Sequence, residues 1–156
     1  MLQKYRYRGD DQIARFAYDK VSVPDQQKLN RYLEQLQAVA VHDLSRDVQY
    51  AFWVNLYNSL TLKVILDHYP LNSIRQINIS PGLFTTGPWG AKLVTIESQP
   101  LSLNDIEHGI LRPLWQDPRS HYVLNCASLG LSLLQIKHNR RKGSESRRSM
   151  TEADAK

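Results

Sequence analysis

The segment from Val48 to Tyr69 is the feature that most constrains what this chain can fold into. It makes about six helical turns before Pro70, and its apolar residues occupy every face of the expected helix. A helix that is apolar all round is buried among other elements. Lys63 and Asp67 lie within it and argue against a membrane span. The sequence therefore predicts a central buried helix, with Ser45 as its cap.

Two further helices are predicted, one on each side of this segment. Ser22 can cap a helix over residues 24–38, where apolar side chains recur at the i, i+3, i+4, i+7 spacing of an amphipathic helix. Ser102, with Asp105 three residues later, is typical of the start of another helix. We expect that helix to end at Arg112 and Pro113.

Short alternating runs predict strands at Ile74–Ile79, Leu93–Ile96 and His121–Cys126. The loop Gly82–Gly90 either closes over a pocket or is a surface excursion. The first twenty residues show no clear period and stay unassigned. Because helices come first and strands follow with a helix between them, the sequence predicts one α+β domain with a small sheet built from the three runs.

The composition suits a single globular domain of 156 residues, with 42% hydrophobic side chains. Its net charge of +5 is uneven along the chain. Residues 1–136 hold 13 basic and 12 acidic side chains and form the predicted domain body. Residues 137–156 hold 7 and 3, with no aromatic ring, so we expect a solvated basic tail. Without aromatic rings among those charges, no specific nucleic-acid binding is expected.

The remaining features exclude several other classes of protein. No apolar run is long enough to span a membrane, and the first residues lack the apolar stretch of a signal peptide, so the chain as it stands is expected in the cytoplasm. A single cysteine excludes an intramolecular disulfide framework. The common phosphate-loop, dinucleotide and zinc motifs are absent, so no cofactor is predicted.

Cys126 is the one thiol and follows a predicted strand. It is either a small buried hydrophobic residue or a nucleophile, which needs a lowered pKa and a base nearby. His121 lies five residues earlier and points to the opposite face of an extended strand. His108, on another element, is the better-placed base. Asn125 could orient the base or donate to an oxyanion.

Two other groups could line a pocket. Glu107 and His108 are adjacent on the third helix and point about 100° apart, so they do not form a metal site by themselves, and Glu107 could equally face solvent. Asn55 and Asn58 stand three apart on one face of the apolar helix, where each buried amide needs partners. They either brace a neighbouring loop or line a polar pocket.

Several runs together resemble the family called domain of unknown function 547. They include Ala51–Asn58, His68–Pro70, Leu101–Pro113, Asp117–Arg119 and His121–Ser128, and the resemblance extends from about Leu2 to Gly130. The residues that match family positions are Trp53, Asn55, Tyr57, Asn58, Glu107, His108, Arg112, Arg119, His121, Asn125, Cys126 and Ser128. The resemblance implies a polar site without naming its reaction.

The chain departs from the family pattern after about Gly130. Members usually continue with a second Cys-Pro and further helices, whereas this chain reads Gly130-Leu-Ser and then becomes basic. We hypothesise a truncated gene or a shifted reading frame from this point. Bacterial members often carry an export signal, so a periplasmic or cell-envelope location is the alternative if an upstream signal is missing.

Two functions follow from these observations. The first is hydrolysis or acyl transfer, with Cys126 as nucleophile, His108 or His121 as base, and Asn125 at the oxyanion. Its pocket would be lined by Asn55, Asn58, Glu107, Arg112, Arg119 and Ser128. The alternative is a noncatalytic binding or scaffold module in which the same residues brace the fold. The sequence identifies no partner.

Overall fold

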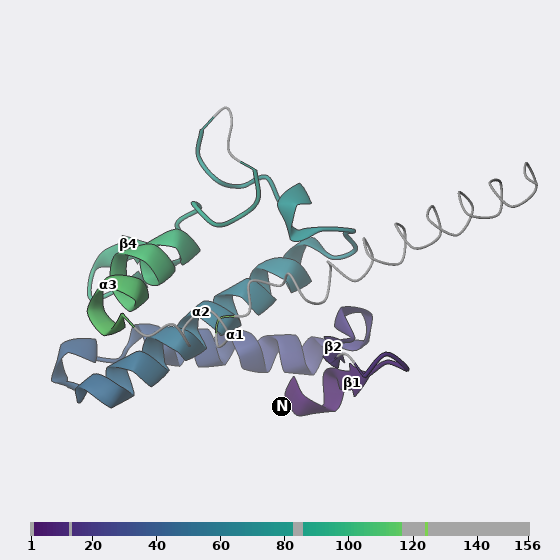
Figure 1. Cartoon of the computed structure of the whole chain (residues 1–156), viewed down its shortest axis with the longest axis horizontal. Coiled ribbons are helices and arrows are strands. Elements are labelled where there is room, and N and C mark those ends of the chain that lie inside the picture. Colours follow the sequence, from purple (N-terminus) through teal and green to yellow (C-terminus); the bar gives the residue numbers. More distant parts are fainter. Residues whose placement is uncertain (1, 13, 83–85, 117–123, 125–156) are drawn as a thin grey trace, which may run out of the picture.

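The computed structural model describes residues 2–12, 14–82, 86–116 and 124. Over this part of the chain the fold is α+β, as predicted, with a long helix at the centre and two small antiparallel sheets (Figure 1). The predicted basic tail, residues 137–156, and the predicted strand His121–Cys126, apart from Leu124, lie outside the described residues.

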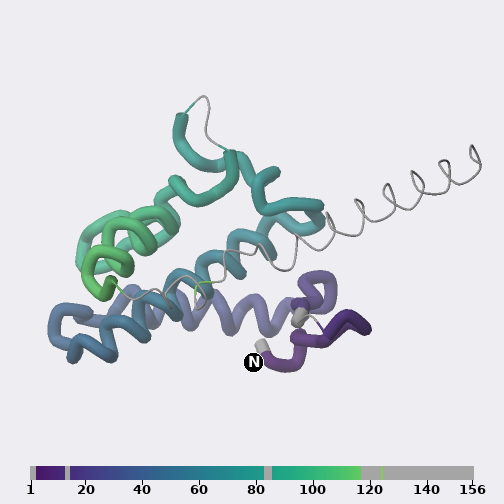
Figure 2. Tube along the Cα trace, viewed as in Figure 1, coloured from purple at the N-terminus to yellow at the C-terminus, as the bar shows by residue number. Residues whose placement is uncertain are grey.

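The first two long helices confirm the periodicity of the sequence. Helix α1 spans Val23–Gln37 and helix α2 spans Arg46–His68, joined through the short 3₁₀ helix η3, Val41–Asp43. Ser22 and Ser45 hold the cap positions, although neither side chain makes a capping hydrogen bond. The chain reverses between the helices, so α1 and α2 pack side by side (Figure 2).

Helix α2 is the centre of the core, as predicted. Leu56, Tyr57 and Ile65 are almost inaccessible to solvent, at 0–1%. The prediction that every face of this helix is buried is wrong for its first half, where Val48 and Asn55 are exposed. Val48 and Asn55 are seven residues apart, which is nearly two full turns, so they lie on one face. That face has no cover in the part of the chain that the structure describes.

The unassigned N-terminus contains a hairpin. After the 3₁₀ helix η1, Leu2–Tyr5, strand β1, Arg6–Arg8, pairs antiparallel with strand β2, Ala14–Phe16, and the 3₁₀ helix η2, Tyr18–Lys20, leads into α1. Such three-residue strands give no clear alternation of apolar and polar residues, because all of β1 is exposed. Tertiary contacts therefore position this segment.

The predicted strand Ile74–Ile79 is wrong. Residues Ile74–Gln76 form a 3₁₀ helix, η4, closed by a capping box in which the Ser73 hydroxyl accepts from the Arg75 amide and the Gln76 side chain accepts from the Ser73 amide. Ile74 and Ile77 are both buried, so the apolar spacing is three residues and not two. This segment consequently takes no part in a sheet.

The run Leu93–Ile96 does form a strand, β3, over Val94–Ile96, with Val94 and Ile96 buried and Thr95 exposed. Its partner is β4, Gln99–Leu101, directly after a two-residue turn, and not the segment near 74. Both turn residues, Glu97 and Ser98, have positive φ angles, 47° and 67°. This is the turn geometry that matches the twist of a tight hairpin.

The third predicted helix is present but does not end at Pro113. Ser102 and Asp105 bond reciprocally at its start, as predicted: the Ser102 amide donates to the Asp105 carboxylate at 2.7 Å, and the Asp105 amide donates to the Ser102 hydroxyl at 3.1 Å. The helix then runs as a π-helical segment, η5, Asp105–Leu111, and continues as α3, Arg112–Trp115.

The π-helical segment explains how the helix passes the proline. In a regular α-helix the ring of Pro113 would press on the carbonyl of Gly109, four residues earlier. The bonding pattern over this stretch is instead i to i−5: the Arg112 amide donates to the Glu107 carbonyl. Leu103, Ile106 and Leu111 still face the core, each with no exposed surface.

One core joins these elements. Buried side chains of α1, α2, β3 and the third helix form its main cluster, which also includes Leu124 at 5% exposure. A smaller cluster contains Val64 and Ile65 of α2 with Ile74 and Ile77. None of the helices in the described part of the chain has the length and hydropathy of a membrane span.

Candidate functional site

Glu107 is the predicted site residue for which the structure shows the most contacts. Its carboxylate is buried, with only 7% of the residue exposed, and two elements supply its partners. The Tyr57 hydroxyl, from the centre of α2, donates to Oε2 at 3.1 Å. Arg112 donates to Oε1 through Nη2 at 2.5 Å and through Nε at 3.2 Å. We call Tyr57, Glu107 and Arg112 the Glu107 cluster.

The π-helical segment is what brings Arg112 onto Glu107. In an α-helix, residues five apart are rotated by about 140° and cannot meet. In η5 the amide of Arg112 bonds to the carbonyl of Glu107, so residues five apart are aligned. The same pair is thus joined by a backbone hydrogen bond and by an ion pair. Single π turns inside helices are frequent at functional sites.

Arg112 connects this buried carboxylate to the surface. Half of its side chain is exposed, whereas the Glu107 side chain is only 10% exposed. An arginine can form hydrogen bonds with two groups at once because its guanidinium carries five N–H donors in a plane. The cluster therefore presents a cation at the surface whose position is held from inside the protein.

His108 points away from this cluster. It is exposed, while its neighbour Glu107 is buried, which agrees with the predicted 100° between them. The alternative that Glu107 faces solvent is wrong, because Tyr57 from α2 supplies a polar partner inside the core. The structure therefore brings Glu107 and Arg112 together and leaves His108 on the outer face of the helix.

The two asparagines do not form the predicted pair of buried amides. Asn58 is half-buried and takes part in a further interaction, but Asn55 is exposed. Residues three apart on a helix are rotated by about 60° from each other, enough for one to reach the edge of the buried face while the other remains outside it. Asn55 therefore needs no protein partner to satisfy its amide.

The other predicted residues cannot be placed by the structure. Arg119, His121, Asn125, Cys126 and Ser128 lie outside the described residues. Within this run only Leu124 is described, and its side chain is buried in the main core. Among the described residues, no group of three or more His, Cys, Asp or Glu side chains could hold a metal ion.

The described part of the glycine-rich loop borders an open hollow. The hollow has a volume of about 330 Å³ and is lined by Ser80, Pro81, Thr86, Trp89, Gly90 and Asn104. Ser80 holds its rim, because its hydroxyl donates to the Gly87 carbonyl at 2.7 Å and accepts from the Gly90 amide at 2.9 Å. Among the described residues that line the hollow, none is a predicted catalytic residue.

A comparison with protein-family models matches residues 41–145 to the family described as "Protein of unknown function, DUF547". The chain belongs to the DUF547 family. The match begins at Val41 rather than near Leu2 and continues past Gly130 to Glu145. It includes α2, the third helix and the whole Glu107 cluster. No curated protein and no solved structure matches this chain.

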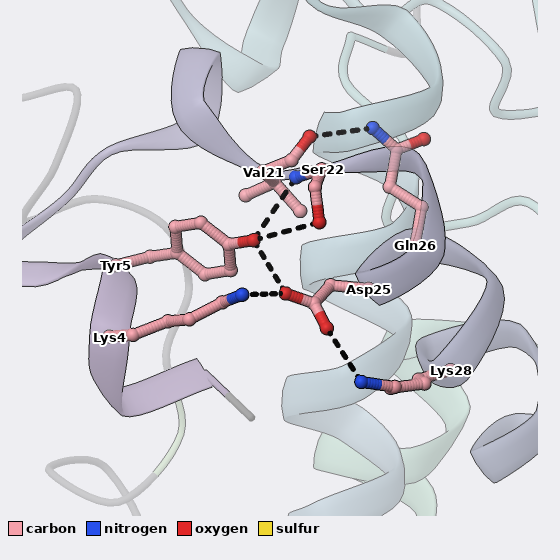
Figure 3. Close-up of polar contacts among 7 residues, drawn as sticks. All are labelled: Lys4, Tyr5, Val21, Ser22, Asp25, Gln26 and Lys28. Carbon is pink, nitrogen blue, oxygen red and sulfur yellow. Dashed lines mark hydrogen bonds and ion pairs between the residues drawn. The ribbon is translucent and has the colours of Figure 1, made fainter.

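A second buried carboxylate, Asp25, lies outside the DUF547 match. Only 2% of Asp25 is exposed, and the Tyr5 hydroxyl donates to its Oδ2 at 2.6 Å (Figure 3). Lys4 pairs with the same oxygen, and Lys28 lies 3.3 Å from Oδ1. The Ser22 amide donates to the Tyr5 hydroxyl at 3.1 Å. We call these residues the Asp25 cluster.

The electrostatics of the Asp25 cluster favour the carboxylate strongly. The ammonium group of Lys4, followed by the Tyr5 hydroxyl, holds the pKa of Asp25 well below its usual range. The cluster joins the N-terminal segment to the first turn of α1. Sequence reasoning missed it, because Tyr5 and Asp25 are twenty residues apart and no local pattern links them.

Two exposed ion pairs involve the segment 92–105: one joins its two ends, and the other joins its middle to the loop before α2. Lys92, 2.7 Å from Asp105, and then the Ser102 hydroxyl lower the pKa of Asp105 to about 2. His42 Nδ1 lies 2.5 Å from the Glu97 carboxylate, which raises the pKa of His42 and joins the loop before α2 to the β3–β4 turn. Both pairs face solvent, so they connect surface loops and are not part of an interior site.

Proposed function

We propose that this DUF547 domain is a cysteine-dependent hydrolase or acyl transferase that acts on a carbonyl substrate, with Cys126 as its nucleophile. The observation that carries the proposal is the burial of Leu124 in the main core, two residues before Cys126. The buried Leu124 shows that the chain contacts the main core directly before the sequence Asn125-Cys126. We propose that Cys126 supplies the nucleophile and Asn125 the oxyanion donor that such chemistry needs.

The proposed reaction balances in two steps. His108 or His121 accepts the thiol proton, the thiolate of Cys126 attacks the carbonyl carbon, and the leaving group departs with that proton. The product of the first step is a thioester on Cys126. Water, or an acceptor nucleophile, then attacks the thioester, gives its proton to the histidine, and restores the thiol. Asn125 donates a hydrogen bond to the oxyanion in both steps.

The Glu107 cluster supports this proposal by offering a fixed cation at the surface. The guanidinium of Arg112 is held by Glu107 and remains half exposed. A cation held in place by the fold costs little to organise when a substrate binds. We propose that Arg112 binds the substrate and that Asn58, Arg119 and Ser128 line the rest of the substrate pocket.

The test is the reactivity of Cys126 in the full chain. Iodoacetamide labelling is measured between pH 5 and 9 for the folded protein and for the protein in denaturant. A nucleophilic cysteine labels faster in the folded state at pH 6–7, because its pKa is lowered. Equal or slower labelling in the folded protein would overturn the proposal. Hydrolysis of a p-nitrophenyl ester, with Cys126→Ala and Cys126→Ser as controls, checks the chemistry directly.

A noncatalytic binding or scaffold module is the second candidate, favoured by one specific observation. Both carboxylate oxygens of Glu107 already have partners within the protein, Tyr57 and Arg112. A carboxylate engaged in this way braces α2 against the third helix and has no need of a substrate. Cys126→Ala separates the two functions, and His108→Ala and His121→Ala then show which histidine is the base. If the wild-type protein hydrolyses the ester no faster than Cys126→Ala does, the scaffold function is the correct one.

A further inference from the structure

Strand β1 has an open edge. In an antiparallel pair, residues alternate between pairs that exchange hydrogen bonds and pairs that do not. The Ala17 amide donates to the Tyr5 carbonyl at 2.9 Å, so Tyr5 and Ala17 form a bonded pair. The register places Tyr7 opposite Arg15 as the next bonded pair. The amides and carbonyls of Arg6 and Arg8 therefore point away from β2.

These outward groups have no partner among the described residues. The backbone hydrogen bonds of the hairpin include none from Arg6 or Arg8 to a third segment. All three residues of β1 are exposed, and 51% of Tyr7 is accessible to solvent. An exposed strand edge with unpaired backbone groups is a template for one more strand.

The side chains of β1 indicate what that strand would carry. Arg6 and Arg8 are two residues apart, so both point to the same face of the hairpin, whereas Tyr7 points to the other. No acidic side chain in the described part of the chain forms an ion pair with either arginine. The other arginine of the hairpin, Arg15, is already paired with Asp11.

We infer that the open edge of β1 binds an extended acidic peptide segment of a partner protein by adding it as a third strand. The partner has acidic residues at two alternate positions, opposite Arg6 and Arg8, and an apolar residue between them, against Tyr7. The acidic residues form the hydrogen-bonded pairs, with Cα atoms about 5.5 Å apart, and exchange amide and carbonyl bonds with both arginines. Opposite charges directly across two strands stabilise such a pairing.

The first experiment uses a fluorescent peptide of sequence Ser-Glu-Val-Glu-Val-Glu-Ser and measures its affinity for the full chain by anisotropy. The control is Ser-Glu-Glu-Glu-Val-Val-Ser, which has the same charge but lacks the alternation. We expect the alternating peptide to bind at least fivefold more tightly. Equal affinity for both peptides, or no binding of either, would overturn the inference, because charge alone would then explain the result.

The second experiment tests the backbone hydrogen bonds. Methylating the glutamate amides of the peptide removes the N–H groups that face β1 and should abolish binding, while methylating the valine amides, which face outward, should leave it unchanged. In the protein, the amide protons of Arg6 and Arg8 should exchange more slowly with solvent in the complex, while that of Tyr7 is already bonded. Unchanged exchange at both arginines would contradict strand addition.

Variants of the protein give a third readout. Arg6→Ala and Arg8→Ala should each lower the affinity for the alternating peptide by about two- to fivefold, as expected for the loss of a single cross-strand charge pair. Arg31→Ala is the matched control, because Arg31 is an exposed arginine on α1 and away from the edge. An equal loss for all three variants would show that the peptide responds to net charge and not to β1.

Discussion

The two buried carboxylates, Asp25 and Glu107, have similar partners but connect different parts of the fold. Each accepts a hydrogen bond from a tyrosine hydroxyl and pairs with a basic side chain. Two partners of Asp25, Lys4 and Tyr5, belong to the N-terminal segment. Among the described residues, no other strong polar contact joins that segment to α1. The Glu107 cluster instead joins the third helix to α2 and depends on a π-helical segment.

The clusters differ in where their buried tyrosines lie, because Tyr57 belongs to the main core whereas Tyr5, although also buried, does not. The lysines of the Asp25 cluster are more than half exposed and return to water at little cost. Tyr57 has no exposed surface and belongs to the main core, so losing Glu107 removes a hydrogen bond from inside that core. The Glu107 cluster should therefore matter to the whole core, and the Asp25 cluster mainly to the N-terminal segment.

The largest expected effect comes from Glu107→Ala. It should lower the free energy of unfolding by about 3 kcal/mol, because the buried hydrogen bond between Tyr57 and Glu107 and the ion pair with Arg112 are both lost. Urea denaturation followed by circular dichroism measures this loss. Glu34→Ala, at an exposed position on α1, is the control and should change little. A loss below about 1 kcal/mol would contradict the expectation that the Glu107 cluster stabilises the whole core.

Asp25→Asn should have a smaller and more local effect. The amide keeps an acceptor for Tyr5 but loses the charge that pairs with Lys4 and Lys28. Hydrogen exchange should accelerate in residues 2–16 and stay unchanged in the middle of α2. Acceleration throughout α2 would show that the N-terminal segment is part of the same cooperative unit as the core.

The same variant predicts a pH dependence. Because the pKa of Asp25 is lowered in the folded state, its contribution is present above the ordinary carboxyl pKa of 3.8 and is lost as the pH falls toward the folded value. The stability difference between wild type and Asp25→Asn should be constant from about pH 7 to 5 and shrink below about pH 4. Asp19→Asn, which removes an exposed acid on η2, is the matched control.

Arg112→Lys sharpens the comparison within the Glu107 cluster. Lysine keeps the positive charge but cannot donate through two nitrogens of a planar group, so we expect a loss of about 1 kcal/mol. Urea denaturation measures the loss, and ester hydrolysis with an anionic substrate reports on binding. If Arg112→Lys is as unstable as Glu107→Ala, the geometry of the guanidinium contributes more to the stability of the cluster than the burial of Tyr57 does.

The smallest effect is expected at His42, which lies at the surface in η3, before α2. Glu97 raises the pKa of His42, so the pair stabilises the fold below pH 6.5 and loses this contribution as the pH rises through the folded pKa. Thermal melts of wild type and His42→Gln should differ slightly at pH 5.5 and coincide at pH 8.5. High salt should reduce the difference, because both side chains are exposed.

Much of the fold could be predicted because its signals are local. The helices α1 and α2 follow from apolar spacing, the bonds between Ser102 and Asp105 follow from two residue types three apart, and β3 follows from alternation. The Ile74–Ile79 run shows the limit of this reasoning. Its apolar residues fit both a strand and a short 3₁₀ helix, and the Ser73 capping box decides between them.

The candidate site was predictable in its residues but only partly in its geometry. The sequence singled out Glu107 and Arg112, and the structure joins them. It also predicted a buried Asn55, which is exposed, because periodicity shows which residues share a face and not what covers that face. Tyr57 was matched to the family without a role, and its contact with Glu107 spans fifty residues of sequence.

The sequence by itself determined the helical framework and the family, since both depend on residue types at fixed short spacings. Only the tertiary structure decided that the third helix adopts a π-helical turn, that Arg112 meets Glu107, and that β1 keeps an open edge. The physical reason is the same in each case. In each case the local residue pattern fits more than one backbone geometry, and contacts with the rest of the fold, such as the hydrogen bond from Tyr57 to Glu107, select one of them.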